Sequence, residues 1–211
     1  MLQHSVWLFL PLFVMTKVFA LPSAMDTSLN GTWTSGNGDV VTGQDFYNLV
    51  NKTFNVPKTT GISYSFLSTN ETSGFWEQAL YQYSRNDGPD CYTLQLVWQH
   101  GNYTIHPNNS ITLDPFKADG LQQFTNTCNH DKDRVEYYAQ QEFMQGFDIT
   151  TYKHLLADDA QWSYKLQLYN YDGSLKTPMY LAYRPALMFP PSPLHMTCLL
   201  YTSPSPRDLS T

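Results

Sequence analysis

The chain has 211 residues, a formal net charge of −6 at neutral pH, and slightly more aromatic residues (15%) than charged ones (14%). This composition is typical of a globular β-protein and excludes a largely disordered chain, and the length suffices for one domain with a real core. Because no cluster of basic residues can neutralise phosphates, the sequence argues against nucleic acid as a partner.

The N-terminal segment has the features of a secretory signal peptide. Val6 to Met15 form a short apolar run, and Val18-Phe19-Ala20 follows with the small-residue pattern of a cleavage site. The run is too short for a comfortable bilayer span. We therefore predict a signal peptide over residues 1–20, with a retained anchor as the alternative, and a linker over residues 21–29.

Entry into the secretory pathway turns five Asn-X-Ser/Thr triplets into candidate glycan acceptors. They begin at Asn30, Asn51, Asn70, Asn102 and Asn108. We expect only some of them to carry a glycan, and we expect Asn30 to be occluded because it adjoins a predicted strand.

The three cysteines are read in the same oxidising context. Cys91 and Cys128 lie inside the predicted domain and can form a disulfide bond, whereas Cys198 is left over near the C-terminus. Two unpaired buried thiols are the alternative.

The folded part is predicted to begin with Asn30-Gly31-Thr32-Trp33. A Gly-x-Trp triplet at the head of the first strand is typical of lipocalin-type barrels, in which the tryptophan closes one end of the core. The next segment, residues 45–54, is predicted to form a brief helix. Alternating apolar residues then predict strands near residues 62–66, 75–83 and 92–98, with shorter ones as far as residue 143.

The strand over residues 75–83 has two possible inward faces. One set contains Phe75, Glu77 and Ala79, and the other contains Trp76, Gln78 and Leu80. We favour the first set because it continues to Tyr83, although it would bury a glutamate.

The last strands are predicted to form a hairpin over residues 162–183, on to which the earlier strands pair in sequence. Apolar residues alternate with polar ones on both sides of Asp172-Gly173, a pair that readily adopts the positive φ of a tight turn. The residues that we predict for the structural core of the domain are Trp33, Trp98, Trp162, Leu166, Leu168 and Leu181.

The predicted fold is all-β, an antiparallel up-and-down meander that spans residues 30–185. A lipocalin-like closed barrel is favoured because closure removes exposed edges, and a sandwich is the alternative. The prolines that follow Pro185 cannot donate to a sheet, so they predict a disordered C-terminal tail over residues 186–211.

No catalytic, metal or cofactor site is predicted. The six histidines include no pair at metal-ligand spacing on a helix, and His100 and His106 are interpreted as surface residues beside turns. The acidic loop over residues 129–133 lacks the glycine and terminal glutamate of a calcium-binding loop. The chain also has no Gly-x-Ser-x-Gly nucleophile elbow.

Six stretches carry a resemblance to a known family: GTWTSGNGDVVTGQDFYN, GISYSF, GFWEQALYQY, LVWQHGNYTI, LDPFKADGLQQF and YKLQLYNYDGSLKTPMYLAYRP. Together they resemble the fungal Rot-one family (reversal of Tor lethality) over about Asn30 to Pro185. That resemblance implies a non-enzymatic chaperone of the endoplasmic reticulum whose partners are secretory glycoproteins and cell-wall synthesis enzymes. It also implies that the protein is required for normal β-1,6-glucan levels and for glycoprotein maturation. It brings no catalytic residues, and the family has cysteines where Cys91 and Cys128 stand.

The C-terminus departs from the family pattern. Family members resemble type I membrane proteins with a terminal anchor, whereas this chain has no apolar span before Thr211. The segment LLYTSPSPRD resembles translated adapter sequence, so we expect the natural chain to differ from about Leu194 onward and to be anchored.

Two other functions remain open at this stage. A lipocalin-like carrier would hold an apolar or glycolipid ligand in an internal cavity. A glucan-processing enzyme would need two carboxylates facing each other across a cleft.

Overall fold

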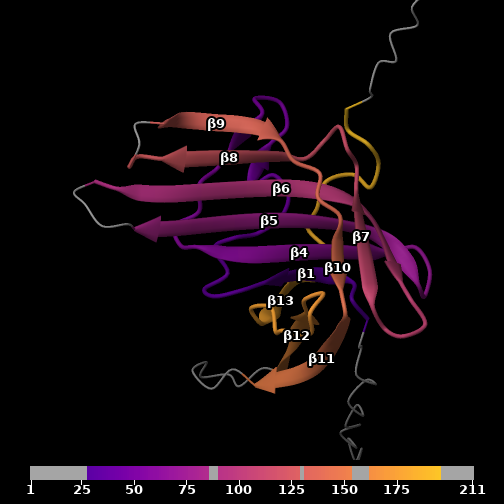
Figure 1. Ribbon diagram of the computed structural model, residues 1–211. Coiled ribbons are helices and arrows are strands. Elements are labelled where there is room, and N and C mark those ends of the chain that lie inside the picture. Colours follow the sequence, from indigo (N-terminus) through magenta and orange to yellow (C-terminus); the bar gives the residue numbers. More distant parts are fainter. Residues whose placement is uncertain (1–27, 86–89, 129–130, 154–161, 196–211) are drawn as a thin grey trace, which may run out of the picture.

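The computed structural model describes residues 28–85, 90–128, 131–153 and 162–195 (Figure 1). The predicted signal peptide and residues 196–211 lie outside these ranges. All regular structure within them is β-strand, and no helix there is long and apolar enough to cross a membrane. The strands are β1 (Gly31–Thr34), β2 (Tyr47–Asn48), β3 (Thr53–Phe54), β4 (Gly61–Ser68), β5 (Ser73–Arg85), β6 (Tyr92–Ile105), β7 (Ile111–Pro115), β8 (Leu121–Asn126), β9 (Asp131–Tyr137), β10 (Glu142–Met144), β11 (Gly146–Lys153), β12 (Trp162–Tyr169) and β13 (Met179–Tyr183).

One antiparallel sheet of eleven strands forms the body of the domain, and β2 pairs separately with β3. The order of the main path is β10-β7-β6-β5-β4-β1-β13-β12-β11, with β8 on β6 and β9 on β8. Its two ends, β10 and β11, are consecutive along the chain and are joined by Gln145 alone. The chain therefore passes from one edge of the bent sheet to the other, as at the corner of a sandwich.

These observations confirm an all-β antiparallel fold, but no closed ring of hydrogen-bonded strands is found among the described residues. The bend at Gln145 ends the pairing of β10 with β7 before β11 pairs with β12. The predicted last hairpin, β12–β13, is present with a ladder of two residue pairs. The other side of β13 pairs with β1, so the first and last strands of the sheet are neighbours.

The sheet forks along β6. The first part of this strand, Thr93–Trp98, pairs with β8, and its last part, Gly101–Ile105, pairs with β7. A Cβ atom on Gly101 would lie 1.9 Å from the carbonyl oxygen of Asp114, so only glycine allows β7 to approach here. Beyond the fork, β8, β9 and the adjoining parts of β5 and β6 extend away from the other strands (Figure 1). We call this part the projecting sheet.

Two hydrophobic cores lie on opposite faces of β5 and β6. The first core fills the inside of the bent sheet, and Trp33, Phe66 and Trp76 are fully buried in it. The second core lies on the other face, where Trp98 stacks on Tyr47 with ring centroids 4.4 Å apart. Phe189 meets the same indole edge-on at 5.5 Å.

The two cores explain why the pattern of residues 75–83 was ambiguous. Trp76 and Gln78 are buried toward the first core, and Glu77 and Ala79 are buried on the face of the second. Both alternating sets are therefore inside at the centre of β5. The favoured set correctly predicted that Glu77 is buried. The choice between the two sets assumed that one face of the sheet is exposed to solvent, and at the centre of β5 neither face is.

Residues 184–195, which we call the C-terminal strap, lie across the second face and do not form a disordered tail. Leu187 N donates to Thr32 Oγ1 at 2.7 Å, and Leu187 O accepts from the hydroxyls of Thr42 and Ser65 at 2.7 and 3.0 Å. The prolines do prevent pairing in the sheet, but side-chain hydroxyls satisfy the backbone instead. The predicted disorder from residue 186 is therefore wrong for residues 186–195.

The predicted helix over residues 45–54 is also absent, and the hairpin β2–β3 takes its place. Asn48 Oδ1 accepts from the backbone N–H groups of Val50 and Asn51 at 3.0 Å each, which fixes a turn instead of a helix. The hairpin buries Phe46 and Tyr47 against the second core.

Replacement of Phe189 tests whether the strap is part of the fold. We expect Phe189→Ala to lower the free energy of unfolding by about 3 kcal/mol, because it empties a buried aromatic site beside Trp98. Urea denaturation followed by tryptophan fluorescence measures the change. Pro191→Ala, at an exposed position of the same segment, is the control and should leave stability nearly unchanged. Equal stability of the Phe189→Ala variant and the unmodified chain would refute the packing.

Candidate functional site

The predicted core residues are placed as follows. Four of them are fully buried, Leu181 is partly buried against the first core, and Trp162 lies in β12 with a side chain outside the described part of the structure. The four buried residues are Trp33, Trp98, Leu166 and Leu168.

A disulfide bond joins Cys91 to Cys128, as the sequence predicted. It closes a segment with a sequence separation of 37 and ties the start of β6 to the end of β8. Such a cross-link stabilises mainly by restricting the unfolded chain. Here it also fastens the two strands at the free end of the projecting sheet.

The five candidate glycan acceptors differ in accessibility. Asn51, Asn70, Asn102 and Asn108 are exposed. Asn30 is half-buried, and its Oδ1 accepts from Ser68 N at 2.6 Å. Occupancy at these sites stays a prediction.

His100 is buried and not a surface residue. Its Nε2 lies 2.9 Å from Asp119 Oδ2, and the ring stacks on Trp98. Asp119 also accepts from the backbone N–H groups of Leu194 and His195 at 2.8 and 2.7 Å. Burial acts to raise the pKa of Asp119, but these donors and His100 outweigh it and lower the pKa. Burial lowers the pKa of His100, which keeps the imidazole neutral.

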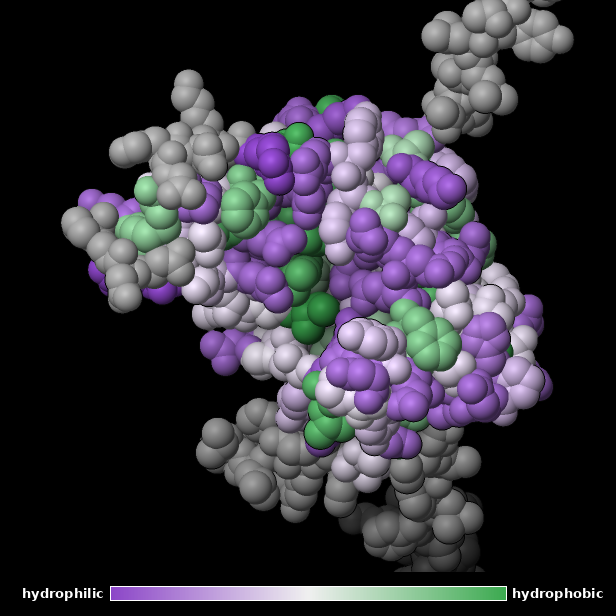
Figure 2. Space-filling view, viewed as in Figure 1, coloured by the Kyte–Doolittle hydropathy of each residue, from purple (hydrophilic) through white to green (hydrophobic). Residues whose placement is uncertain are grey.

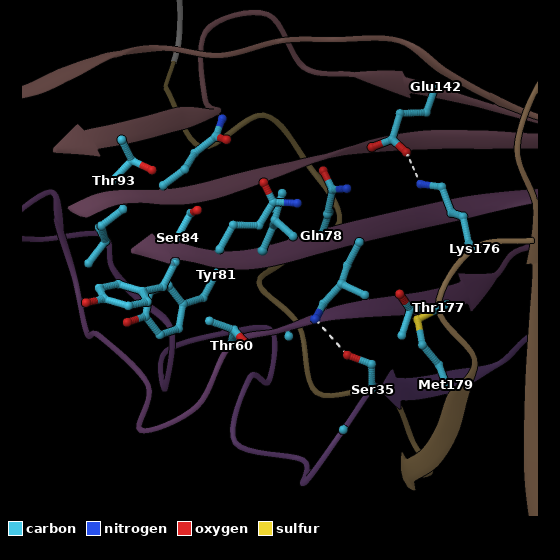
Figure 3. Close-up of a pocket in the computed structure, with 18 of the residues that line it drawn as sticks. Ser35, Thr60, Gln78, Tyr81, Ser84, Thr93, Glu142, Lys176, Thr177 and Met179 are labelled. Atoms are coloured by element: carbon cyan, nitrogen blue, oxygen red, sulfur yellow. Dashed lines mark hydrogen bonds and ion pairs between the residues drawn. The ribbon is translucent and has the colours of Figure 1, made fainter. Parts of the chain in front are cut away.

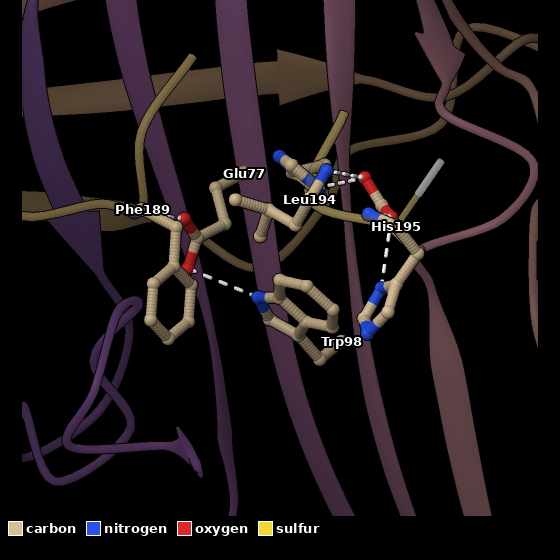
Figure 4. Close-up of polar contacts among 7 residues, drawn as sticks. Glu77, Trp98, Phe189, Leu194 and His195 are labelled. Carbon is tan, nitrogen blue, oxygen red and sulfur yellow. Dashed lines mark hydrogen bonds and ion pairs between the residues drawn. The ribbon is translucent and has the colours of Figure 1, made fainter. Parts of the chain in front are cut away.

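Glu77 is the second buried carboxylate that holds the strap (Figure 4). Its Oε2 accepts from Phe189 N at 2.6 Å, and its Oε1 accepts from Gly43 N at 2.6 Å and Trp98 Nε1 at 3.1 Å. Burial raises the pKa of Glu77 to about 7, although the three donors act to lower it. The second face is thus held by two acids, Glu77 and Asp119, that accept N–H groups of the strap.

On the opposite face, an open trough of about 930 Å³ runs over β4, β5 and β6 beside the connection between β12 and β13 (Figure 3). Tyr64 Oη donates to Glu142 Oε2 at 2.8 Å. Lys176 Nζ donates to Tyr64 Oη and to Glu142 Oε2, at 2.8 Å each. Burial and the adjacent Glu142 raise the pKa of Tyr64 well above its usual value. The phenol therefore stays protonated and donates to the carboxylate.

The space-filling view shows this side as a furrow with hydrophobic residues at its bottom and hydrophilic residues on both banks (Figure 2). Sequence analysis missed the polar group around Tyr64, Glu142 and Lys176. Tyr64 and Lys176 are 112 residues apart, and no local pattern links them.

An exposed apolar strip lies on the second face of the projecting sheet, beyond the edge of the second core. The strand register places four residues on the same face as Trp98: Tyr83, Leu94, Val135 and Tyr137. Val135 is 53% exposed and Tyr137 is 71% exposed. Apolar side chains that stay exposed next to a core are typical of protein–protein contact surfaces.

The geometry describes a disulfide-linked β-sheet domain with a polar trough on one face and an exposed apolar strip on the other. In the described part of the chain, no group of three His, Cys, Asp or Glu residues is arranged to hold a metal ion. Residues 29–202 match the model of the Rot1 family, described as "chaperone for protein-folding within the ER, fungal". The chain belongs to this family.

Individual relatives agree with the family match. The chain is 39% identical over 171 residues to Protein ROT1 of Yarrowia lipolytica, an alignment that covers 80% of this chain and 65% of that protein. It is 37% identical over 192 residues to Protein rot1 of Schizosaccharomyces pombe, with 90% and 78% covered, and 36% identical over 183 residues to Protein ROT1 of Saccharomyces cerevisiae, with 86% and 68% covered. The chain thus spans about two thirds of the Yarrowia protein. No solved structure matches the chain.

The pKa of Glu77 predicts a specific pH dependence. Since this pKa is about 7 in the folded chain against an ordinary 4.5, the folded state binds more protons than the unfolded state between these values. The contribution of Glu77 to the free energy of unfolding therefore falls as pH rises through this window, by about 3 kcal/mol in total. His100, whose pKa is lowered, acts in the opposite direction below its ordinary pKa of 6.5.

The variant Glu77→Gln isolates this contribution, since His100 and Asp119 are unchanged in it. We expect the stability of the variant, relative to the unmodified chain, to increase as pH rises from about 4.5 to about 7. Urea denaturation at several pH values measures the difference. A difference that stays constant over this range would show that Glu77 titrates normally.

Proposed function

We propose that this chain is a luminal chaperone or assembly factor of the endoplasmic reticulum, which holds non-native secretory proteins on the apolar strip of the projecting sheet. The observation that carries the proposal is the exposure of Val135 and Tyr137 on a sheet that is held by a disulfide bond and a packed core. The description of the family supports the location and the general role.

The chemistry of the strip suits the retention of unfolded chains. An unfolded client exposes apolar side chains, and burying them against Tyr83, Val135 and Tyr137 removes apolar surface from water. Tyrosine adds a hydroxyl that tolerates polar neighbours, so the surface accepts varied sequences. Binding through side chains of this kind requires no catalytic group.

The clients that we propose are secretory glycoproteins and enzymes of cell-wall synthesis. Loss of the protein should then lower β-1,6-glucan in the wall and impair glycoprotein maturation. We also propose that the natural protein is membrane-anchored with this domain in the lumen. These points rest on the resemblance to the family.

The alternative of a carrier for an apolar ligand receives less support. Tryptophan, tyrosine and phenylalanine side chains pack the interior of the bent sheet, and the trough on this face is open and lined by polar as well as apolar groups. An apolar ligand would gain little burial there.

An aggregation assay tests the proposal. The full chain, purified with its disulfide intact, should suppress the aggregation of chemically denatured citrate synthase. The double variant Val135→Ser, Tyr137→Ser should need an about tenfold higher concentration for the same effect, because two central contact residues are lost. Both positions are exposed, so the fold should persist.

Tyr171→Ser is the matched control. Tyr171 is 77% exposed, like Tyr137, but lies in the connection between β12 and β13. It should suppress aggregation as well as the unmodified chain does. The proposal fails if the unmodified chain has no effect, and the strip is not the binding surface if the double variant matches the control.

A further inference from the structure

The trough on the first face has an apolar floor and polar walls. Ile62 of β4 and Leu80 of β5, which are directly opposite each other in the sheet, contribute apolar surface, and the fully buried Met179 lies beneath the hollow. Gln78, Ser84, Thr93 and the other labelled side chains gather round the hollow in Figure 3. A ligand that fits must therefore have both an apolar face and many hydrogen-bonding groups.

The charges in the trough cancel each other. Lys176 and Glu142 form an ion pair at 2.8 Å, and their side chains are 19% and 18% exposed. Lys176 is held in place because Gln167 Nε2 donates to its backbone carbonyl at 2.7 Å and its own N–H donates to Leu168 O at 2.9 Å. A neutralised pair attracts neither a phosphate nor a free cation, which argues for an uncharged ligand.

Side-chain amides extend the polar surface along the strands. Gln78 Nε2 donates to Tyr64 Oη at 2.7 Å, and Gln78 Oε1 accepts from Gln99 Nε2 at 2.8 Å. Further out, Gln82 lies directly opposite Gln95 in the strand register, and Gln82 is exposed. An amide offers a donor and an acceptor side by side, which matches the paired hydroxyls of a sugar ring.

Backbone pairing argues against a peptide as the ligand. Along the trough, β5 is paired with β4 on one side and with β6 on the other, and β6 is paired with β8. These strands leave no open edge on to which an extended peptide can add by main-chain hydrogen bonds. Recognition must come from side-chain amides and hydroxyls.

We propose that the trough is a binding site for a neutral saccharide. The ring would lie with its apolar face on Ile62 and Leu80, and its hydroxyls would reach the side chains of Gln82 and Lys176. The side chains of Gln82 and Lys176 are on the face opposite to the apolar strip, although Tyr83 and Leu94 border both sites. The inference does not depend on the proposed function.

Saccharide titrations of the full chain test the site. The probes are glucose, mannose, N-acetylglucosamine and their disaccharides, with glucose 6-phosphate and a neutral Gly-Ser hexapeptide for comparison. We expect a saturable change in the side-chain amide NMR signals of Gln82 and Gln95 with at least one neutral saccharide. The phosphate and the peptide should bind more weakly or not at all.

Variants locate the binding. Gln82→Ala should weaken the affinity about fivefold through one lost hydrogen bond, and Lys176→Met should weaken it about tenfold. Gln82 is exposed, so its replacement does not threaten the fold, and Gln44→Ala on an exposed loop is the matched control. The proposal is overturned if no neutral saccharide binds, if Gln82→Ala binds like Gln44→Ala, or if the hexapeptide binds in preference.

A final comparison identifies the source of the sugar. A denatured glycoprotein and the glycan released from it are titrated separately. Equal binding of the released glycan supports recognition of the sugar itself. Binding only while the glycan is attached to the polypeptide would assign recognition to the peptide and contradict the proposal.

Discussion

The carboxylate of Glu77, sealed between the sheet and its cover, is the constraint on which the second half of the structure depends. Its oxygens accept N–H groups from Gly43, Trp98 and Phe189. These donors belong to the loop after β1, to β6 and to the C-terminal strap, which no sheet pairing joins together. If Glu77 lost these donors, its side chain would be buried without hydrogen-bond partners. This would cost several kcal/mol of stability. The three segments must therefore come together as a unit.

The two faces of this sheet carry the two proposed sites. The second face is closed by the strap as far as the projecting sheet, where the cover ends and Tyr137 stays exposed. The first face encloses the aromatic core and ends in the trough beside Lys176. A client chain on one side and a saccharide on the other would not compete for space. A luminal folding factor with these two sites would be able to engage a glycoprotein by its polypeptide and by its sugar.

Local sequence patterns predicted much of the sheet and little of what covers it. Some features depend only on residues close in the sequence, as do the alternation around Leu166 and Leu168 and the turn at Asp172-Gly173. The disulfide between Cys91 and Cys128 follows from the oxidising compartment that the signal peptide predicts. These features could be predicted directly. The position of the strap could not be predicted, because it is held through backbone groups such as Leu187 N and O. Backbone groups of this kind leave no specific signal in the amino-acid sequence. Prolines in a segment indicate that it does not pair in a sheet. They give no information about buried carboxylates in distant strands that accept the N–H groups of the segment.

The candidate sites were hidden for a related reason. His100 precedes a glycine, so the sequence indicates a surface residue beside a turn, yet both His100 and its partner Asp119 are buried. Their burial follows from the fork in β6 and from the strap, which are long-range features. The Tyr64–Glu142–Lys176 group likewise joins β4, β10 and the last connection, and only the folded sheet brings them together.

Amide hydrogen exchange along residues 187–195 tests the central claim most directly. The account predicts slow exchange at Phe189, Leu194 and His195, whose N–H groups donate to the buried carboxylates of Glu77 and Asp119. These amides should be protected nearly as well as those of β5 and β6. Exchange at the rate of an unstructured peptide, in a chain whose sheet is protected, would contradict the account.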